Sequence, residues 1–350
     1  MPGPSSAPAS IPDALAGLGW GPRWAALAAD RPEGSEPARV VRHDGIAVVV
    51  AGADAVGPRP LRPALPPLAV GDWLLVDDEA IVGLLERTSL LQRRDPTRGG
   101  AQLIAANLDR VGIVCGLDRP VKPGRIQRFV VQVFDAGAVP MVVLTKADVT
   151  DDIAAAVEIV ERAAPAVDVI VTSVRTEHGL DDLRTVVADR TVAFVGESGA
   201  GKSTLVNALA GRELAATSAV RKGDSKGRHT TTSRELHVLP GHCVLVDTPG
   251  LREIGLFTDV ETVDDVFDDV ARDLDEACRF RDCTHTNEPG CAVLAAIERG
   301  DLDGDRYAAW QVLRAEAEAA ELRGDPVARH QAEKRFGRMA REAQRLKYGR

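Results

Sequence analysis

The sequence predicts a multidomain α/β protein, and three observations support this fold class. The chain has 350 residues, more than one ordinary hydrophobic core holds. Short apolar runs separated by glycine and proline occupy residues 38–94 and indicate a small β-rich domain. From about residue 102, continuous apolar runs alternate with amphipathic stretches, which is typical of a mostly parallel sheet with helices on both faces.

Composition and charge narrow the class of protein further. Hydrophobic residues make up 45% of the chain and charged residues 27%, which excludes a wholly disordered protein. No run of 18 apolar residues is present, and the N-terminal sequence lacks the pattern of a secretory signal, so we expect no membrane partner. Five cysteines are too few for a disulfide scaffold and indicate a reducing compartment.

The N-terminal region divides into two predicted parts. Residues 1–36 form an arm followed by short Ala-rich helices that contain Trp20 and Trp24. In residues 37–94, four short apolar runs predict strands, and the Pro-rich stretch 58–67 separates two of them. A five-stranded OB-like β-barrel fits this length best, and a β-rich interaction domain of another topology is the alternative. The four runs are 40–41, 46–50, 73–76 and 80–85.

Residues 95–256 have the rhythm of a doubly covered parallel sheet. Apolar strands and amphipathic helices alternate, and two further apolar runs follow after a polar stretch. The predicted strands are 111–115, 139–144, 167–171, 192–195, 235–239 and 243–246. The predicted helices are 125–134, 153–163, 180–187 and 201–210.

A phosphate-binding loop is predicted between strand 192–195 and the helix that follows it. Residues 196–203 read GESGAGKS, a full match to the P-loop pattern in its required strand–helix context. Glycines let the loop fold tightly, so that backbone N–H groups point at phosphate oxygens. Lys202 would reach the β- and γ-phosphates, and Ser203 would place its hydroxyl on Mg²⁺. A plain Gly-rich strand–helix turn is the alternative. The predicted phosphate-binding residues are Gly196, Glu197, Ser198, Gly199, Ala200, Gly201, Lys202, Ser203 and Thr204.

A second phosphate-side motif follows strand 243–246. Asp247-Thr248-Pro249-Gly250 begins with an acidic residue at the end of an apolar strand, which suits an outer-sphere contact to Mg²⁺. The amide of Gly250 would then sense the γ-phosphate. Taken alone, these four residues also read as an ordinary turn.

A base-recognition motif lies before the P-loop in the chain. Strand 139–144 ends in Thr145-Lys146-Ala147-Asp148, which resembles the Asn-Lys-x-Asp motif of GTPases, where the aspartate binds guanine and the lysine stem packs on the base. The next strand ends in a segment that includes Ser173 and resembles the loop that closes over guanine. Ordinary GTPases carry these motifs after the P-loop, so the order here predicts a circularly permuted GTPase domain.

The C-terminal residues 257–350 are predicted to form a helical, zinc-binding domain with a basic terminal helix. Cys278, Cys283, His285 and Cys291 provide three thiolates and an imidazole within fourteen residues, which suits one structural Zn²⁺; scattered buried cysteines are the alternative. From residue 326 to 350, eight basic and two acidic residues give the tail a charge of +6, which leaves −15 for the other 325 residues against a total of −9. The tail is either an RNA-phosphate contact or a helix packed on its own domain.

Together these parts resemble the small ribosomal subunit biogenesis GTPases of the RsgA (YjeQ) family. The most specific stretches are 196–207, 227–232, 247–250 and 278–293. The resemblance implies a cytoplasmic GTP hydrolase, acting with Mg²⁺ and one structural Zn²⁺, that binds the 30S ribosomal subunit and its 16S rRNA late in assembly. It also implies slow turnover that the 30S particle stimulates and that is coupled to release. We expect a monomer.

Two positions depart from the usual GTPase pattern. Thr145 replaces Asn, so the side-chain amide that braces the base loop is missing, and we expect guanine selectivity to rest on Asp148. Leu251 stands where many GTPases carry a water-orienting Gln, and leucine cannot hydrogen-bond water. His229, in the polar loop 221–232, is the catalytic substitute proposed for the family; a histidine that contacts RNA or solvent is the alternative.

Two rival functions compete with the GTPase interpretation. An ABC-type ATPase shares the P-loop, but the sequence has no Leu-Ser-Gly-Gly-Gln signature and no apolar strand ending in Asp-Glu. An RNA-binding module with a purely structural nucleotide site is the second rival.

Overall fold

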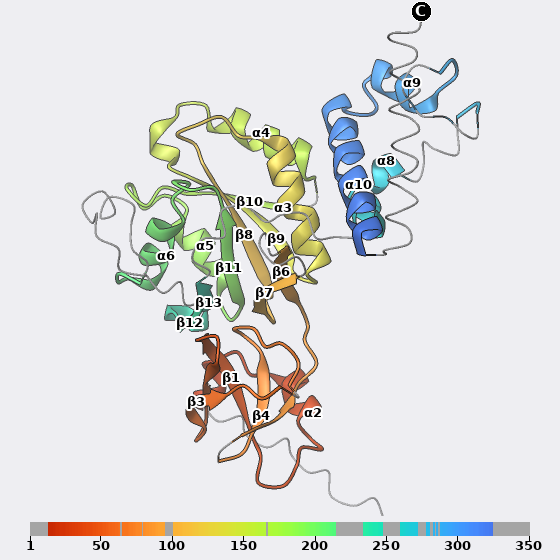
Figure 1. Ribbon diagram of the computed structural model, residues 1–350. Helices are drawn as coiled ribbons and strands as arrows, with labels where there is room; N and C mark the ends of the chain where they lie inside the picture. The colour runs from red at the N-terminus through yellow and green to blue at the C-terminus, as the bar shows by residue number, and fades with distance from the viewer. Residues whose placement is uncertain are drawn as a thin grey trace, which may run out of the picture. The chain divides into compact units, whose positions relative to one another are not determined.

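The structure is a computed structural model, and the residues it describes fall into two compact units (Figure 1). The first holds the described residues up to 247 except 130–135, and the second holds 130–135 and those from 260 onward. The described residues are 13–63, 65–78, 80–94, 101–165, 167–214, 234–247, 260–271, 278–280, 283, 285 and 288–324.

The N-terminal part of the first unit contains two short helices and five antiparallel strands. Hydrogen bonds connect the strands in the order β3-β2-β1-β4-β5. No ladder joins β3 to β5 among the described residues, so closure into an OB-like barrel stays a prediction. The elements are α1 Asp13–Ala16, α2 Pro22–Leu27, β1 Glu36–His43, β2 Ala47–Gly52, β3 Val56–Pro60, β4 Trp73–Val76 and β5 Ile81–Leu84.

Strand β3 differs from the sequence-based prediction, which treated the stretch from residue 58 as a separator. Pro58 and Pro60 pair with Val49 and Ala47 of β2. Strand β3 pairs with β2 on one side only, and its other edge is open. A proline whose missing N–H lies on the open edge removes no inter-strand hydrogen bond, so the strand accepts prolines.

A buried arginine joins this β-rich part to the following sheet. Arg39 of β1 is 1% exposed, and its guanidinium lies 5.3 Å from the ring of Trp73. It donates hydrogen bonds to the hydroxyl of Thr191 and to backbone carbonyl oxygens of the neighbouring segments. Burial lowers its pKa to about 10, so the charge is held in a poorly solvated place. The carbonyl acceptors belong to Leu18, Gly71 and Asn107.

The central sheet has the predicted parallel character. Its order is β10-β9-β8-β11-β13-β12, and only β12 runs antiparallel to its neighbour. Long buried runs rich in valine explain why these strands lie inside and are covered on both faces. The strands are β8 Arg110–Gly116, β9 Val139–Thr145, β10 Asp168–Val171, β11 Thr191–Gly196, β12 Arg234–Val238 and β13 Val244–Asp247.

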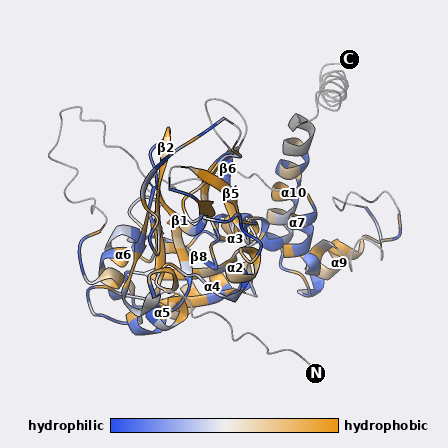
Figure 2. Ribbon diagram, turned by 90° about the horizontal axis from the view of Figure 1, so that it is seen from below, coloured by the Kyte–Doolittle hydropathy of each residue, from blue (hydrophilic) through white to orange (hydrophobic). Residues whose placement is uncertain are grey.

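Helices cover both faces of this sheet, as predicted. Apolar residues of α5 Leu180–Val187 and α6 Lys202–Ala210 share one core with the strands. The helices α3 Pro123–Asp135 and α4 Ile153–Ala163 cover the opposite face (Figure 1). In Figure 2 the strands are largely hydrophobic in colour, whereas the helices show hydrophilic residues on their outer sides. Two 3₁₀ turns, Ala147–Val149 and Pro240–His242, lie in the loops.

The β-rich part and the central sheet share backbone hydrogen bonds. Strand β1 pairs with β12 at Arg42–Glu235 and His43–Arg234, so one ladder crosses from the first to the second. A separate hairpin, β6 Leu90–Arg94 and β7 Ala101–Ala106, spans the boundary predicted between residues 94 and 95. The sequence pattern predicts no strands in this hairpin.

The second unit is helical, as predicted. Its core contains Phe267, Tyr307 and Trp310, and the Trp310 indole N–H donates to Asp264 at 2.9 Å. No helix within the described ranges combines the length and the apolar content needed to cross a membrane. The helices are α7 Val260–Val266, α8 Asp268–Ala271, α9 Ala292–Arg299 and α10 Gly304–Gly324.

Candidate nucleotide site and metal centre

The predicted P-loop begins where β11 ends and finishes where α6 starts. Gly196, Gly199 and Gly201 have φ values of 137°, 78° and 95°, which side chains with a Cβ rarely adopt. A Cβ on Gly196 would also overlap the carbonyl oxygen of Val114 on the adjacent strand. The loop therefore depends on glycine, and its last turn leads directly into the N-terminus of α6, which favours anions.

The lysine of the loop is folded back onto the loop itself. The ammonium group of Lys202 donates to the carbonyl oxygens of Gly196 at 2.6 Å and Glu197 at 2.7 Å. These carbonyls hold a strongly hydrated cation next to the backbone amides of the loop. A phosphate bound to those amides would meet a positive charge that is already in position.

The base-recognition motif follows β9 and is held in a defined conformation. Ser173 donates to one carboxylate oxygen of Asp148 at 2.6 Å, and Arg175 approaches the other at 3.4 Å. The hydrogen bond from Ser173 is the largest cause that holds the pKa of Asp148 below its usual range. The carboxylate therefore stays ionised at neutral pH, which the predicted contact to guanine requires.

The two motifs line the same cavity although they lie far apart in the chain. The cavity has a volume of about 180 Å³ and is lined by both the base motif and the P-loop. Small-molecule pockets are commonly about 300–1,000 Å³, so this cavity encloses part of a ligand rather than a whole one. Its lining residues are Thr145, Lys146, Asp148, Val149, Val174, Arg175, Gly201 and Thr204.

Lys146 bridges the base motif and the P-loop. It has a left-handed backbone conformation with φ 61°, and its ammonium group donates to the carbonyl oxygen of Gly199 at 2.6 Å. Asp118 binds the same ammonium group at 2.8 Å. Sequence reasoning missed Asp118 and Arg175, although both follow the carboxyl end of a parallel strand, where ligands bind in such sheets.

The structure shows a different hydrogen bond at the position where the side-chain amide is missing. Thr145 has no amide, but its hydroxyl donates to the carbonyl oxygen of Ala200 at 2.5 Å. Thr145 is 5% exposed, so this hydrogen bond is shielded from water. A shorter side chain therefore still links the base motif to the P-loop.

The predicted magnesium residues lie at the same edge of the sheet. Ser203 is in the first turn of α6, directly after the P-loop. Asp247 ends β13, which is the parallel neighbour of β11. A hydroxyl and a carboxylate are hard oxygen donors of the kind that Mg²⁺ prefers.

The four predicted zinc ligands converge in the second unit. Their ligand atoms all lie within 4.8 Å of one another. The Sγ of Cys278 is 3.5 Å from Nδ1 of His285, and that Nδ1 is 3.3 Å from the Sγ of Cys291. Tetrahedral bonds of about 2.0–2.3 Å place ligand atoms roughly 3.3–3.8 Å apart, a range that includes these two distances. The Cys278, Cys283, His285, Cys291 set is therefore compatible with a Zn²⁺ site.

Backbone N–H groups support the sulfur atoms of this cluster. The amide of Ala292 donates to Cys278 at 3.3 Å, and the amide of Leu294 donates to Cys291 at 3.5 Å. Cys291 is also the N-cap residue of α9, so the cluster is connected to a helix start. Such contacts orient ligands and favour the thiolate form.

The two remaining cysteines lie in the predicted apolar strands 111–115 and 243–246, where the sequence predicts plain core residues. Cys243 is 2% exposed and confirms this prediction. Cys115 is only half-buried and lines a small cavity between β8 and α3, although burial still raises its pKa to about 11.

Several predicted residues lie outside the described parts of the chain. They are His229, Gly250, Leu251, the loop 221–232, the N-terminal arm 1–10 and the basic tail 326–350.

Comparisons with known proteins find a matching family model and similar sequences. The family model described as RsgA GTPase matches residues 84–257. A Small ribosomal subunit biogenesis GTPase RsgA of Streptomyces coelicolor is 42% identical over 352 residues, covering 95% of this chain and 96% of the relative. A Small ribosomal subunit biogenesis GTPase RsgA 2 of Vibrio parahaemolyticus is 40% identical, covering 95% and 93%.

Solved structures show the same fold. The crystal structure of YjeQ from Thermotoga maritima is 25% identical, covers 81% of this chain and 98% of that one, and has a TM-score of 0.59. YloQ, described as a circularly permuted GTPase, matches with a TM-score of 0.56 at 22% identity, covering 83% and 97%.

Proposed function

Because the chain belongs to the RsgA GTPase family, and is therefore a GTP hydrolase, we propose that it acts as a late maturation factor of the 30S ribosomal subunit. In this proposal the 30S particle stimulates GTP hydrolysis, and hydrolysis is coupled to release of the protein from the particle. The protein works as a cytoplasmic monomer and contacts 16S rRNA. The relatives' names support the ribosomal role, since they describe small ribosomal subunit biogenesis GTPases.

The observation that carries the nucleotide assignment is the shared cavity of the base motif and the P-loop. Asp148, fixed by Ser173, accepts hydrogen bonds from the N1–H and the exocyclic amine of guanine. Adenine cannot match this pair of donors, because its N1 is an acceptor. Gly201 and Thr204 on the same cavity wall belong to the phosphate-binding loop and its helix. The guanine and phosphate contacts therefore belong to one nucleotide.

We assign the catalytic work to electrostatic stabilisation. Lys202 and the P-loop amides stabilise the charge that develops on the transferred phosphoryl group. Ser203 and Asp247 would hold Mg²⁺, which would supply additional positive charge to the phosphates when bound. The amide of Gly250 would sense the γ-phosphate, and His229 is our candidate for orienting the attacking water. The zinc cluster has a structural role.

The test of this function is GTP turnover with and without purified 30S subunits. We expect slow turnover by the protein alone and a clear increase with 30S subunits, because the particle completes the arrangement needed for hydrolysis. Lys202→Ala is the control and should remove both rates. Unchanged 30S-dependent turnover in that variant would favour an RNA-binding module with a structural nucleotide site.

Two further measurements separate the details of the proposal. Competition by ATP should be weak, and tight ATP binding that excludes GTP would support the ATPase rival instead. The protein should bind 30S subunits more tightly with a non-hydrolysable GTP analogue than with GDP. Equal affinities in the two states would contradict the coupling of hydrolysis to release.

A further inference from the structure

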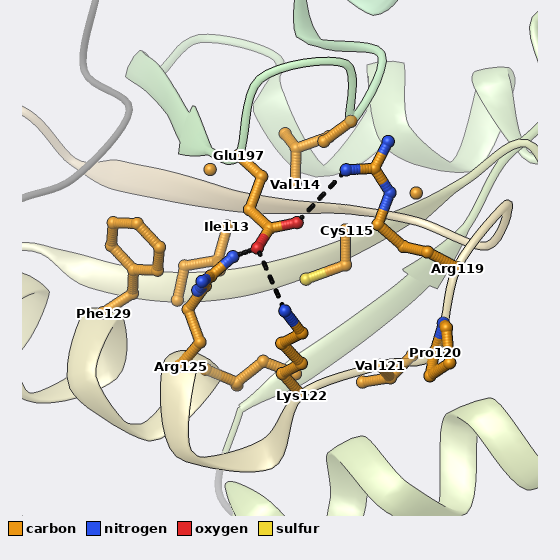
Figure 3. Close-up of a pocket in the computed structure, with 14 residues that line it drawn as sticks. Ile113, Val114, Cys115, Arg119, Pro120, Val121, Lys122, Arg125, Phe129 and Glu197 are labelled. Carbon is orange, nitrogen blue, oxygen red and sulfur yellow. Dashed lines mark hydrogen bonds and ion pairs between the residues drawn. The ribbon is translucent and has the colours of Figure 1, made fainter.

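Three basic side chains converge on one carboxylate behind the P-loop (Figure 3). Arg119 and Lys122 lie in the segment that joins β8 to α3, Arg125 lies in the first turn of α3, and the carboxylate belongs to Glu197 of the loop. Arg119 reaches one oxygen of Glu197 at 3.4 Å, and Lys122 approaches the other at 3.9 Å. Arg125 contacts that second oxygen too. We call Arg119, Lys122 and Arg125 the cationic cluster.

The cationic cluster carries more positive charge than Glu197 balances. Asp118 is the next acidic side chain, and it is shared between Arg119 at 3.2 Å and Lys146 at 2.8 Å. Lys122 is also the residue before α3, and Arg125 is in the first turn of that helix, where the helix dipole adds positive potential. Three cations at this place are unfavourable unless an anion compensates for them.

The side chains of the cationic cluster are more exposed to solvent than the Glu197 carboxylate that they contact. The exposed fractions are 40% for Arg119, 62% for Lys122 and 37% for Arg125, against 25% for Glu197. An anion approaching from solvent therefore meets the guanidinium and ammonium groups first. The cluster contains two Arg side chains, whose planar forks match phosphate oxygens.

The cationic cluster is separate from the nucleotide cavity but touches the same loop. Its cavity is lined by Gly196, Glu197 and Ala200, together with residues of β8 and α3. Arg119 also donates to the carbonyl oxygen of Ser198 at 3.5 Å. A change in what binds the cluster would thus act directly on the backbone that holds the phosphates.

We propose that the cationic cluster is a binding site for a phosphodiester group of RNA, and that Glu197 occupies this site until RNA displaces it. This inference rests on the proposed function, which supplies an RNA-containing partner, and it names a contact surface on the GTPase domain. The overall acidic chain, with net charge −9, makes a local cationic cluster a selective place for a polyanion. Displacement of Glu197 provides a physical route from RNA contact to the P-loop.

The first experiment removes two cluster charges and measures 30S binding as a function of salt. The variant is Lys122→Gln/Arg125→Gln, and neither residue belongs to the nucleotide-binding residues assigned above. The matched control is Arg162→Gln/Arg184→Gln, which removes two exposed charges from the last turns of α4 and α5. Each lost phosphate contact reduces the slope of log K against log salt by about 0.7–0.9.

The expected result is a slope about 0.7–0.9 smaller for the cluster variant, for both 30S subunits and protein-free 16S rRNA, with the control unchanged. GTP turnover without 30S subunits should stay at the wild-type rate, whereas the stimulated rate should fall at subsaturating 30S concentration. Wild-type slopes in the cluster variant would overturn the proposal. A loss for 30S subunits without a loss for protein-free 16S rRNA would also overturn it, because the ligand would then be a ribosomal protein.

The second experiment tests the competing carboxylate. Glu197→Gln keeps the size of the side chain but removes its charge, so the nucleotide-free protein should bind protein-free 16S rRNA more tightly at low salt. Equal or weaker binding would overturn the role of Glu197. If the turnover of the wild-type protein does not respond to 30S subunits, the proposed function fails. If the wild-type protein responds and the cluster variant responds equally, only the inference about the cationic cluster is contradicted.

Discussion

At the scale of single residues, the site depends on short side chains that connect two loops. Thr145 binds the carbonyl of Ala200 and Lys146 binds the carbonyl of Gly199, so consecutive residues of the base motif hold consecutive residues of the P-loop. A nucleotide that pulls on either loop therefore acts on both. This arrangement explains how the motif tolerates threonine in its first position.

We expect Thr145→Val to weaken nucleotide binding. Valine keeps the shape but removes the hydroxyl, and it leaves the buried carbonyl oxygen of Ala200 without this donor, which costs about 1–3 kcal/mol. GTP affinity, measured by titration calorimetry, should fall several-fold. Thr145→Ser keeps the hydroxyl and serves as the control; equal losses in both variants would exclude the hydrogen bond as the cause.

Asp148→Asn should exchange the base preference. The amide can donate where the carboxylate accepted, so it suits the carbonyl oxygen of xanthine in place of the guanine amine. We expect GTP affinity to fall roughly a hundredfold and xanthosine triphosphate to bind in its place. Competition binding with the two nucleotides checks this, and retained GTP preference would remove Asp148 from the base site.

We expect the thiols of Cys115 and Cys243 to react slowly because burial disfavours their thiolate forms. Burial raises the pKa of Cys115 to about 11 and that of Cys243 to about 12, so both are overwhelmingly neutral at pH 8. Because only the thiolate reacts, alkylation of the folded protein should be slow and should accelerate about tenfold per pH unit up to those values. Mass spectrometry of iodoacetamide-treated protein measures this, with urea-unfolded protein as the control. Fast labelling of Cys243 at pH 8 would contradict its buried position.

At the scale of elements, sequence periodicity predicted the strands of the central sheet well but missed β3 and the β6–β7 hairpin, which lie outside it. Helices 153–163 and 180–187 have the predicted bounds, because each has a clear apolar face and a strand on either side. Strand β3 was missed because its prolines are tolerated only at an open edge. The hairpin β6–β7 was missed because half-polar strands such as LLQRR lack an apolar run.

In the candidate site, residues of short sequence motifs could be predicted, whereas residues that act through tertiary contacts could not. The glycine spacing, Lys202, Asp148 and the four zinc ligands follow from sequence, since each belongs to a short motif with a chemical reason. The partners Asp118 and Arg175 do not, because they contribute through tertiary contacts with residues from other segments. The hydrogen bond from the Thr145 hydroxyl could not be predicted from the sequence either, since its acceptor is a backbone carbonyl oxygen 55 residues away.

Removal of zinc should unfold the metal-binding part of the second unit. The ligands connect residues 278–291 to the start of α9, and Cys291 caps that helix. A strong chelator at pH 7 should therefore reduce helical circular dichroism, and added Zn²⁺ should restore it. Cys291→Ala should show the reduced signal without chelator. An unchanged spectrum after verified metal loss would contradict a structural role.

At the scale of the whole molecule, the β-rich part and the central sheet are one body because they share a ladder and a buried cation. Arg39 binds acceptors from the N-terminal helices, the β4 region, the segment before β8 and the start of β11. Strand β11 leads directly to the P-loop, so the arginine connects the first strand of the chain to the strand that positions the phosphate site. Unfolding of these parts should therefore be cooperative.

Arg39→Met should destabilise the first unit strongly. Methionine fills much of the volume but leaves several buried acceptors unpaired, so we expect a loss of about 3–5 kcal/mol. Urea unfolding followed by tryptophan fluorescence measures it, since Trp73 packs beside the guanidinium and Trp20 packs against Trp73. Arg42→Met, on the same strand but paired with Asp44 near the surface, is the control and should change stability little. Equal effects of both substitutions would contradict the special role of Arg39.

The ladder between β1 and β12 also limits where the gene can be cut. A fragment that starts after residue 94 would lose β6, which is half of the β6–β7 hairpin. It would also lose β1, so β12 would become an edge strand whose open side can pair with a second molecule. Such a fragment should precipitate or form dimers through that edge even though it retains every nucleotide-binding motif. The domain boundaries that the sequence predicts are therefore a poor guide to which fragments of this chain fold alone.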